Sequence, residues 1–161
     1  MFPEQTKALA AGVLDGARNA GIRVTTVETV TSGLVAAALT SVSGASSIVE
    51  RGFILYHDSA KATGLGVSEE ISRTHGAVSA EVTKGLAEGG LRNSTAGIAI
   101  AVTGYAGPTG GNDKDPVGTC YVAVSRNGAD TVVERHLCDG GRDAVRLAAV
   151  DAALKLAIAQ L

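Results

Sequence analysis

The chain of 161 residues has a hydrophobic fraction of 45% and a charged fraction of 19%, a composition typical of one globular domain and outside the range of disordered chains. Its 14 basic and 16 acidic side chains give a formal net charge of −2, which excludes a general positive field for nucleic acid or an anionic membrane. Because the apolar stretches are far shorter than the roughly 20 residues of a membrane span and no basic-then-apolar leader begins the chain, we expect a cytoplasmic protein.

The first third of the chain predicts a helix, a strand, a turn and a second helix. Apolar residues recur at helical spacing from Pro3 to Ala20, and Gly21 follows as a stop signal. The short, β-branched segment Arg23–Val27 predicts a strand. An alanine-rich run, Leu34–Leu39, predicts the next helix, so the turn lies between Val27 and Gly33.

The middle of the chain predicts two strands separated by short helices. Phe53–Tyr56 has the pattern of a strand, and Ser59–Gly64 and Ser68–Thr74 have the pattern of short helices, the latter with a serine N-cap. Ser79–Leu91 predicts a longer helix that also begins at a serine. Gly97–Val102 is a continuous apolar run between turn signals, which is typical of a central strand buried on both faces.

The last third predicts an antiparallel hairpin and a closing helix. Val117–Ser125 and Thr131–Leu137 have the pattern of strands, and Asn127-Gly128 between them favours a tight turn. Arg142–Leu161 has helical periodicity. We therefore predict one α/β domain over residues 1–161, with a mixed, mostly parallel sheet, a late antiparallel hairpin and helices on both faces.

The one long irregular segment, Gly104–Pro116, follows the predicted central strand. Ligands of open α/β sheets bind at the carboxyl ends of strands. The four glycines between Thr103 and Gly111 let backbone N–H groups approach a phosphate or a developing oxyanion closely. The alternative is an ordinary glycine-rich surface turn that binds nothing.

The segment Thr25–Gly33 places hydroxyls and one carboxylate on a strand-to-helix turn. A hydroxyl at such a turn can face a cleft and act as a nucleophile beside helix N–H groups that favour negative charge. Alternatively, these hydroxyls are helix caps. Glu28 can likewise be a structural acceptor of hydrogen bonds from the turn.

Tyr56 and Lys61 are five positions apart across a turn, so both can reach one site. A lysine or a tyrosine there could take a proton from a hydroxyl, whereas the alternative for Lys61 is a solvated position on a helix. His57 suggests a Ser/His arrangement, although one histidine beside a carboxylate is seldom catalytic.

Arg142 and Arg146 are four positions apart at the start of the last helix. This spacing places both guanidinium groups on one face, where they could bind a phosphate or a carboxylate. The alternative is a solvated helix end with salt bridges to nearby acids. Cys120 and Cys138 form no CxxC motif and no zinc-ligand cluster, so we interpret both as buried or half-buried thiols and expect no metal.

The order and spacing of these segments resemble the CinA C-terminal domain family, the nicotinamide mononucleotide deamidases, over nearly the whole chain. The family pattern contains A-E-S-C-T-G-G, G-x-x-x-Y-x-x-x-x-K, H-G-A-V-S, G-I-A-G-P-x-G-G, K-P-V-G-T and G-x-R-x-x-x-R. The corresponding segments here are Val27–Gly33, Gly52–Lys61, His75–Ser79, Gly104–Gly111, Asp115–Thr119 and Gly140–Arg146.

The resemblance implies hydrolysis of the carboxamide of nicotinamide mononucleotide to nicotinate mononucleotide and ammonia, a step of pyridine nucleotide salvage in NAD metabolism, without metal or cofactor. The family's nucleophilic serine falls on Thr29, and its two helpers fall on Tyr56 and Lys61. The implied substrate-binding residues are Glu28, Thr31, Thr103, Gly104, Gly107, Gly110, Gly111, Arg142 and Arg146. We expect a small-molecule pyridine mononucleotide as the partner and a homo-oligomer as the assembly.

The departures from the family pattern are concentrated in the nucleophile turn. Thr29 keeps a hydroxyl but adds a methyl group that restricts χ1, Val30 replaces a cysteine, and Ser32 replaces a glycine. In the later loop Tyr105 replaces an isoleucine and Asp115 replaces a lysine. The leading hypothesis is an amidase with Thr29 in the nucleophile position.

The alternative is a catalytically inactive or altered paralogue that acts as a nucleotide-binding or oligomeric interaction module. A nucleic-acid-binding function has no support from a basic face or an aromatic platform.

Overall fold

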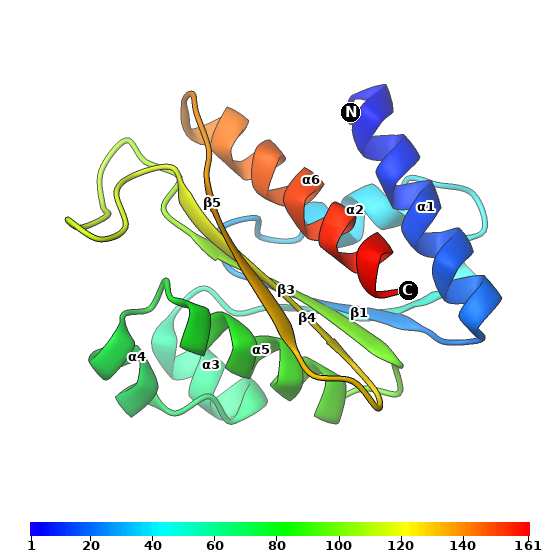
Figure 1. The fold of residues 1–161 in the computed structure, drawn as a ribbon, viewed down its shortest axis with the longest axis horizontal. Coiled ribbons are helices and arrows are strands. Elements are labelled where there is room, and N and C mark those ends of the chain that lie inside the picture. Colours follow the sequence, from blue (N-terminus) through cyan, green and yellow to red (C-terminus); the bar gives the residue numbers. More distant parts are fainter.

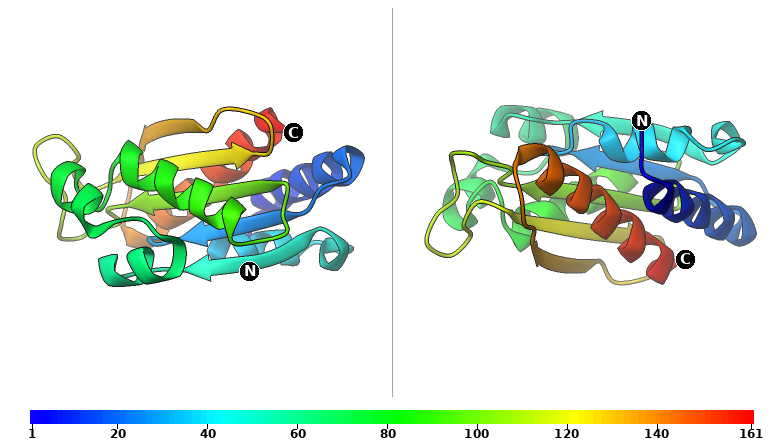
Figure 2. Two further views of the ribbon diagram at one scale, coloured as in Figure 1. Left: turned by 90° about the horizontal axis from the view of Figure 1, so that it is seen from below. Right: turned by 90° about the horizontal axis from the view of Figure 1, so that it is seen from above.

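The computed structural model describes residues 1–161, which form a five-stranded sheet between two layers of helices (Figures 1 and 2). The strand order is β2-β1-β3-β4-β5, in which the first three strands are parallel and the last two are antiparallel to their neighbours. The strands are β1 (Val24–Glu28), β2 (Val49–Ile54), β3 (Ile98–Gly104), β4 (Thr119–Arg126) and β5 (Val132–Leu137). The predicted fold class is confirmed.

Helices cover both faces of the sheet (Figure 1). On one face lie α1 (Glu4–Ala20), α2 (Leu34–Thr40) and α6 (Arg142–Gln160), and a short 3-10 turn, η1 (Ala45–Ser47), follows α2. On the other face lie α3 (Asp58–Leu65), α4 (Glu69–His75) and α5 (Ala80–Arg92). None of these helices is both long and apolar enough to cross a membrane.

The sheet separates two apolar clusters. The larger cluster packs the sheet against α1, α2 and α6 and includes the fully buried side chains of Leu39, Ile100 and Leu154. The smaller cluster, which includes Val27 and Leu86, packs the sheet against α5. β3 lies at the centre of the sheet and contributes to both clusters, as its uninterrupted apolar sequence predicts.

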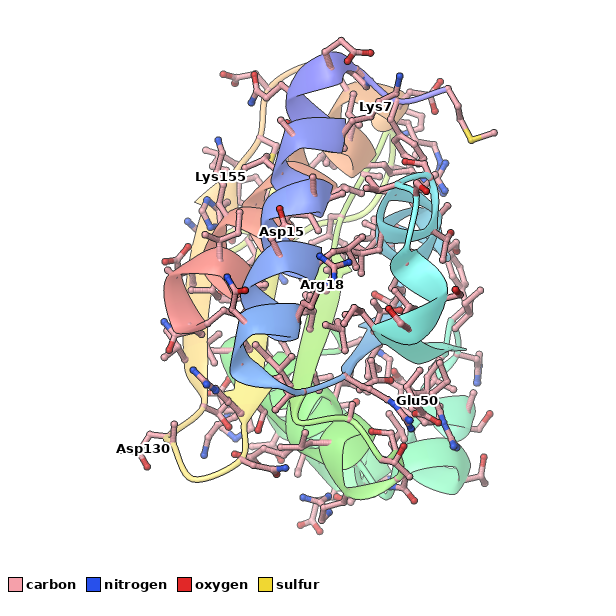
Figure 3. All side chains as sticks on the ribbon, turned by 90° about the vertical axis from the view of Figure 1, so that its right-hand side faces the viewer. Lys7, Asp15, Arg18, Glu50, Asp130 and Lys155 are labelled. Atoms are coloured by element: carbon pink, nitrogen blue, oxygen red, sulfur yellow. The ribbon has the colours of Figure 1, made fainter.

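The helix ends follow the predicted signals. Gly21 ends α1 with φ of +67°, a left-handed conformation that glycine adopts without strain. The Ser68 and Ser79 hydroxyls accept hydrogen bonds from backbone N–H groups in the first turns of α4 and α5, and each such cap stabilises by about 1 kcal/mol. The charged residues Asp15 and Arg18 project outward from α1 and form an exposed ion pair at 2.6 Å (Figure 3).

The predicted bounds of the second strand are wrong. The strand begins at Val49 and ends at Ile54, not at Phe53 and Tyr56, because the polar residues Glu50 and Arg51 interrupt its apolar pattern. In the hairpin, Asn127-Gly128 occupies a turn closed by the Ala129 N–H to the Arg126 carbonyl (3.1 Å). This is the predicted tight turn, and β5 begins at Val132, one residue after the predicted start at Thr131.

Candidate functional site

A cleft of about 270 Å³ opens at the sheet edge where the parallel strands β1, β2 and β3 end. It gathers residues from four connections that are far apart in the sequence. Its lining consists of Thr29, Val30, Tyr56, His57, Asp58, Lys61, Ala77, Val78 and Gly104. All three residues predicted to be catalytic, Thr29, Tyr56 and Lys61, therefore lie at one cleft.

The buried carboxylate of Glu28 organises the turn that carries Thr29. Glu28 is fully buried and accepts hydrogen bonds from the Thr31 hydroxyl (2.7 Å) and from the N–H groups of Gly33 (2.9 Å), Val35 (3.0 Å) and Ala36 (2.9 Å). These four donors occupy the carboxylate. The alternative that Glu28 is a structural acceptor is therefore supported, and the substrate contacts of Glu28 and of the fully buried Thr31 stay predictions.

Thr29 lies at the end of β1 and is 7% exposed. Its N–H and its hydroxyl both donate to the carbonyl of Val102 on β3, each at 3.1 Å. The hydroxyl oxygen thus sits against the central strand, and its hydrogen bond runs to the backbone and not to Lys61 or Tyr56.

The two predicted helpers of Thr29 have different environments. The side chain of Lys61 is 4% exposed and its Nζ donates to Asp58 Oδ1 at 2.8 Å. Tyr56 is 63% exposed and its hydroxyl accepts from Arg142 Nη2 at 3.3 Å. Lys61 therefore lies in the wall of the cleft, and Tyr56 lies at its rim.

The backbone N–H of Gly104 is directed toward the cleft side of the sheet. The neighbouring N–H of Tyr105 donates to the Thr119 carbonyl on the β4 side (2.9 Å), and because successive N–H groups alternate sides along a strand, that of Gly104 points toward β1. The Thr29 carbonyl is the acceptor that would continue the β1–β3 hydrogen-bond ladder at this point. Instead, it accepts hydrogen bonds from the N–H and the hydroxyl of Ser32, both at 3.1 Å. The Gly104 N–H can therefore serve a ligand.

Arg142 and Arg146, which share one face of α6, contact different segments of the chain. Arg142 is exposed at the rim and donates through Nη1 to the Gly107 carbonyl at 2.8 Å. Arg146 donates to the carbonyls of Val30 (3.0 Å) and Thr31 (3.2 Å). Arg146 thus holds the turn after Thr29, and Arg142 is the one that remains a candidate for phosphate binding.

The rest of the glycine-rich loop makes contacts within the loop and does not line the cleft. Gly110 and Gly111 do not line the cleft; the loop extends beyond the end of the sheet (Figure 1). A Cβ on Gly111 would lie 2.7 Å from the Val117 N atom, so the glycine permits a close approach of two backbone segments. Thr103 is fully buried and its hydroxyl bonds that of Thr83 at 2.8 Å. Direct substrate contacts by Thr103, Gly110 and Gly111 therefore stay predictions.

Several cleft residues were not predicted as site residues. His57 caps α3, because its Nδ1 accepts from the Ser59 N–H (3.2 Å), which argues against a catalytic base. Ala77 and Val78 enter the cleft between α4 and α5, and the only signal for them was the H-G-A-V-S segment. Asp58 carried no separate signal beyond its place beside His57.

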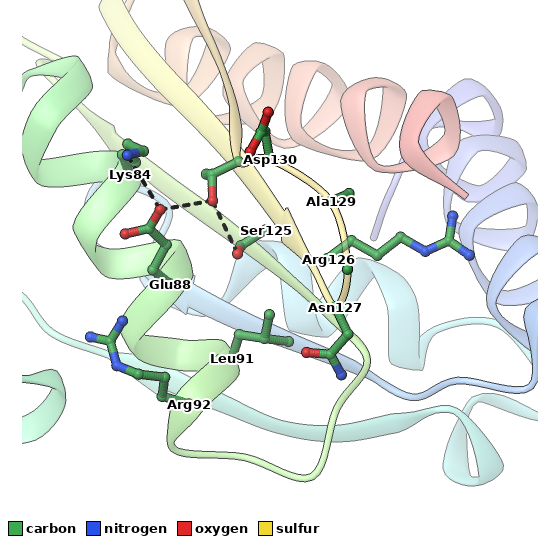
Figure 4. Close-up of a pocket in the computed structure, with 11 residues that line it drawn as sticks. Lys84, Glu88, Leu91, Arg92, Ser125, Arg126, Asn127, Ala129 and Asp130 are labelled. Atoms are coloured by element: carbon green, nitrogen blue, oxygen red, sulfur yellow. Dashed lines mark hydrogen bonds and ion pairs between the residues drawn. The ribbon is translucent and has the colours of Figure 1, made fainter.

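A second and larger cleft, of about 540 Å³, lies at the opposite end of the sheet between α5 and the β4–β5 turn (Figure 4). Its polar groups bond one another: the Thr131 hydroxyl bonds Glu88 Oε1 (3.0 Å) and Ser125 Oγ (3.1 Å), and Lys84 Nζ lies 3.4 Å from Glu88. No residue predicted for catalysis or binding lines it. The smaller cleft is therefore the candidate active site.

The two thiols, far apart in sequence, lie side by side. Cys120 is buried, Cys138 is half-buried, and their sulfur atoms are 3.4 Å apart without a disulfide, which confirms the predicted burial. Burial, together with the neighbouring Cys138, strongly raises the pKa of the Cys120 thiol. The structure contains no cluster of three or more His, Cys, Asp or Glu side chains that could hold a metal ion.

Comparison with known proteins gives consistent matches. The profile of the CinA C-terminal domain matches residues 6–161. The nicotinamide-nucleotide amidohydrolase PncC of Escherichia coli K12 is 42% identical over 84% of this chain and 82% of its own length. A CinA-like protein of Syntrophobacter fumaroxidans is 43% identical over 86% of this chain, which spans only 32% of that longer protein.

The solved structures agree with the sequence matches. The crystal structure of the competence/damage inducible protein CihA from Agrobacterium tumefaciens has a TM-score of 0.95 and 39% identity, covering 99% of this chain and 97% of that one. The match extends over helices, sheet and cleft segments alike. The chain belongs to the CinA C-terminal domain family.

Proposed function

We propose that the protein is a nicotinamide-nucleotide amidase that hydrolyses the carboxamide of nicotinamide mononucleotide to nicotinate mononucleotide and ammonia. The observation that carries the proposal is the convergence of Thr29, Tyr56 and Lys61 at one cleft. The relative named nicotinamide-nucleotide amidohydrolase, 42% identical over most of this chain, supports the same substrate. Because the chain spans about a third of the CinA-like relatives, any activity that needs their remaining length lies outside the proposal.

In the proposed reaction the Thr29 hydroxyl oxygen attacks the carboxamide carbon and forms an ester. Its proton passes to Lys61 Nζ, which returns it to the leaving nitrogen as the carbon–nitrogen bond breaks and ammonia departs. A water molecule then attacks the ester, restoring the Thr29 hydroxyl and releasing the carboxylate product. The Gly104 N–H donates a hydrogen bond to the carboxamide oxygen, on which negative charge develops in both steps.

Residues at the rim of the cleft make the proposed contacts to the phosphate of the mononucleotide. Arg142 is exposed beside the cleft, and its guanidinium already bridges the Gly107 carbonyl and the Tyr56 hydroxyl. A planar, permanently charged group at this position suits a phosphate. Glu28, Thr31, Thr103 and Arg146 support the site from beneath the surface.

The second candidate is a catalytically inactive or altered paralogue that binds nucleotide or forms an oligomeric interaction module. The observation that favours it is the bond from the Thr29 hydroxyl to Val102, which directs the hydroxyl away from Lys61. The homo-oligomer and the cytoplasmic location remain predictions, and light scattering of the purified protein would test the former.

The decisive experiment incubates purified protein with nicotinamide mononucleotide and measures ammonia and nicotinate mononucleotide in equal amounts. Thr29→Ala supplies the control for contaminating amidases. An upward thermal shift with pyridine mononucleotides but no ammonia would favour the paralogue. If the protein releases no product and shows no thermal shift, the proposed substrate is refuted.

A further inference from the structure

Asp58 is the first residue of α3 and lies in the same cleft as Lys61. Its Oδ1 accepts from Lys61 Nζ at 2.8 Å, and this is the hydrogen bond that the lysine amine makes in the structure. The side chain of Asp58 is 40% exposed, whereas that of Lys61 is 4% exposed. The pair therefore joins a solvent-facing carboxylate to an amine inside the cleft wall.

A comparison within the chain shows that this is not an ordinary helix-surface pair. Two other pairs have the same i,i+3 spacing, Glu4 with Lys7 and Asp15 with Arg18. Their cationic side chains are 43% and 47% exposed, so water screens them and they contribute little. Of these three cations only Lys61 is buried, and burying a charged amine without a partner costs free energy.

The carboxylate also fixes the position of a long side chain. A lysine side chain has four rotatable bonds, so its amine occupies one place only where a partner holds it. The N-terminus of α3 is itself fixed, because His57 Nδ1 accepts from the Ser59 N–H and the His57 carbonyl accepts from the Lys61 N–H (3.3 Å). Asp58 thus stands on a rigid helix start directly beside the amine.

We propose that Asp58 is a positioning residue that holds the Lys61 amine at the cleft for proton transfer. The proposal rests on the proposed function, because it is Lys61 that exchanges the proton with Thr29 and the leaving nitrogen. Asp58 bonds the Lys61 amine and is given no proton-transfer step of its own. Its effect on turnover passes through Lys61.

The test compares Asp58→Asn with Asp58→Glu in the whole chain. Removing the carboxylate charge is expected to lower kcat about 10- to 100-fold, the usual result of misplacing a catalytic group by about 1 Å, with KM changed less than about twofold because substrate contacts remain. Asp58→Glu is expected to recover part of the lost kcat. The matched control is Glu69→Gln, which removes an exposed carboxylate from the first turn of the neighbouring helix α4 and is expected to leave kcat unchanged.

A second measurement does not depend on turnover. Acetylation of Lys61 by a water-soluble succinimidyl ester, followed by peptide mass spectrometry, reports whether the amine is held. Lys61 is expected to react several-fold faster in Asp58→Asn than in wild type, and at the wild-type rate in Glu69→Gln.

The outcomes separate the two proposals. A wild-type kcat and a wild-type Lys61 reactivity in Asp58→Asn would overturn the role of Asp58 while leaving the amidase intact. Equal losses of kcat and melting temperature in Asp58→Asn and Glu69→Gln would also overturn it, by showing a general helix effect. If wild-type protein releases no ammonia, the proposed function fails, and the acetylation rates still decide whether Asp58 holds Lys61.

Discussion

The hydroxyl of Thr29 donates to the carbonyl of Val102 at 3.1 Å, so the proposed nucleophile is bonded to the central strand of the sheet. A threonine has two heavy atoms on Cβ, and its χ1 angle is therefore more restricted than that of a serine. Turning the oxygen toward Lys61 also moves the methyl group within a turn that is already packed. We therefore expect the position of the proposed nucleophile to limit the rate of the proposed reaction.

Replacing Thr29 by serine is expected to increase turnover of nicotinamide mononucleotide, because the smaller side chain can leave Val102 without displacing a methyl group. A gain of about tenfold corresponds to a barrier lower by about 1.4 kcal/mol. The measurement is initial-rate ammonia release at saturating substrate. Thr29→Ala should lose at least about 100-fold, and an alanine variant with wild-type turnover would show that Thr29 is not the nucleophile.

Replacing Glu28 by glutamine is expected to destabilise the protein. The amide keeps the shape but presents an NH₂ group to backbone N–H donors at Gly33, Val35 and Ala36, so at least one buried hydrogen bond is lost. A cost of about 2–4 kcal/mol follows, a fall in melting temperature of roughly 5–15 °C for a domain of this size. Differential scanning calorimetry measures it, with the exposed Glu69→Gln as the unchanged control. A shift below about 1 °C would contradict the role given to Glu28.

The sequence predicts most of the fold because its strongest signals are local. The apolar run Gly97–Val102 indicates a strand buried on both faces, and Ser79 indicates a helix start, and the structure contains both. The first half of β2 was missed because Glu50 and Arg51 interrupt the apolar pattern of this edge strand. The tight turn at Asn127-Gly128 and the start of the following strand were predicted to within one residue, because the turn dipeptide and the β-branched run are both local signals.

The candidate site was predictable in part. The family resemblance predicted that Thr29, Tyr56 and Lys61 share one site. The periodicity of the sequence does not indicate this, because it reports only local structure. The partners of Arg146 were not predictable, since they lie 115 and 116 positions away and bond through backbone carbonyls that have no residue signature. Helical spacing correctly shows that two arginines share a face, but the tertiary neighbours decide what each one contacts.

Cys138 is expected to react with iodoacetamide well before Cys120. The thiolate is the reactive form, and burial together with the neighbouring sulfur raises the pKa of Cys120, so its thiolate is scarce at pH 8. Peptide mass spectrometry after timed alkylation measures both sites. In Cys138→Ser the Cys120 thiol should stay largely unmodified in the native protein and react fully in guanidinium chloride. Equal native rates at the two sites would contradict the burial described for Cys120.

Replacing each of the two arginines of α6 by glutamine is expected to change different properties of the protein. Arg146→Gln removes two charge-assisted hydrogen bonds to the turn after Thr29, so both kcat and stability should fall, the latter by about 1.5–3 kcal/mol. Arg142→Gln removes an exposed cation at the rim, so KM for the mononucleotide should rise about tenfold while stability stays within about 0.5 kcal/mol. Steady-state kinetics and thermal melting of the two variants distinguish these results.

The same variants assayed with nicotinamide riboside, which lacks the phosphate, complete the test. Arg142→Gln should have no further effect on that poorer substrate, whereas Arg146→Gln should still lower its kcat. If Arg146→Gln raised KM alone, the guanidinium would be meeting the phosphate after all, and its contacts with Val30 and Thr31 would have to break when substrate binds.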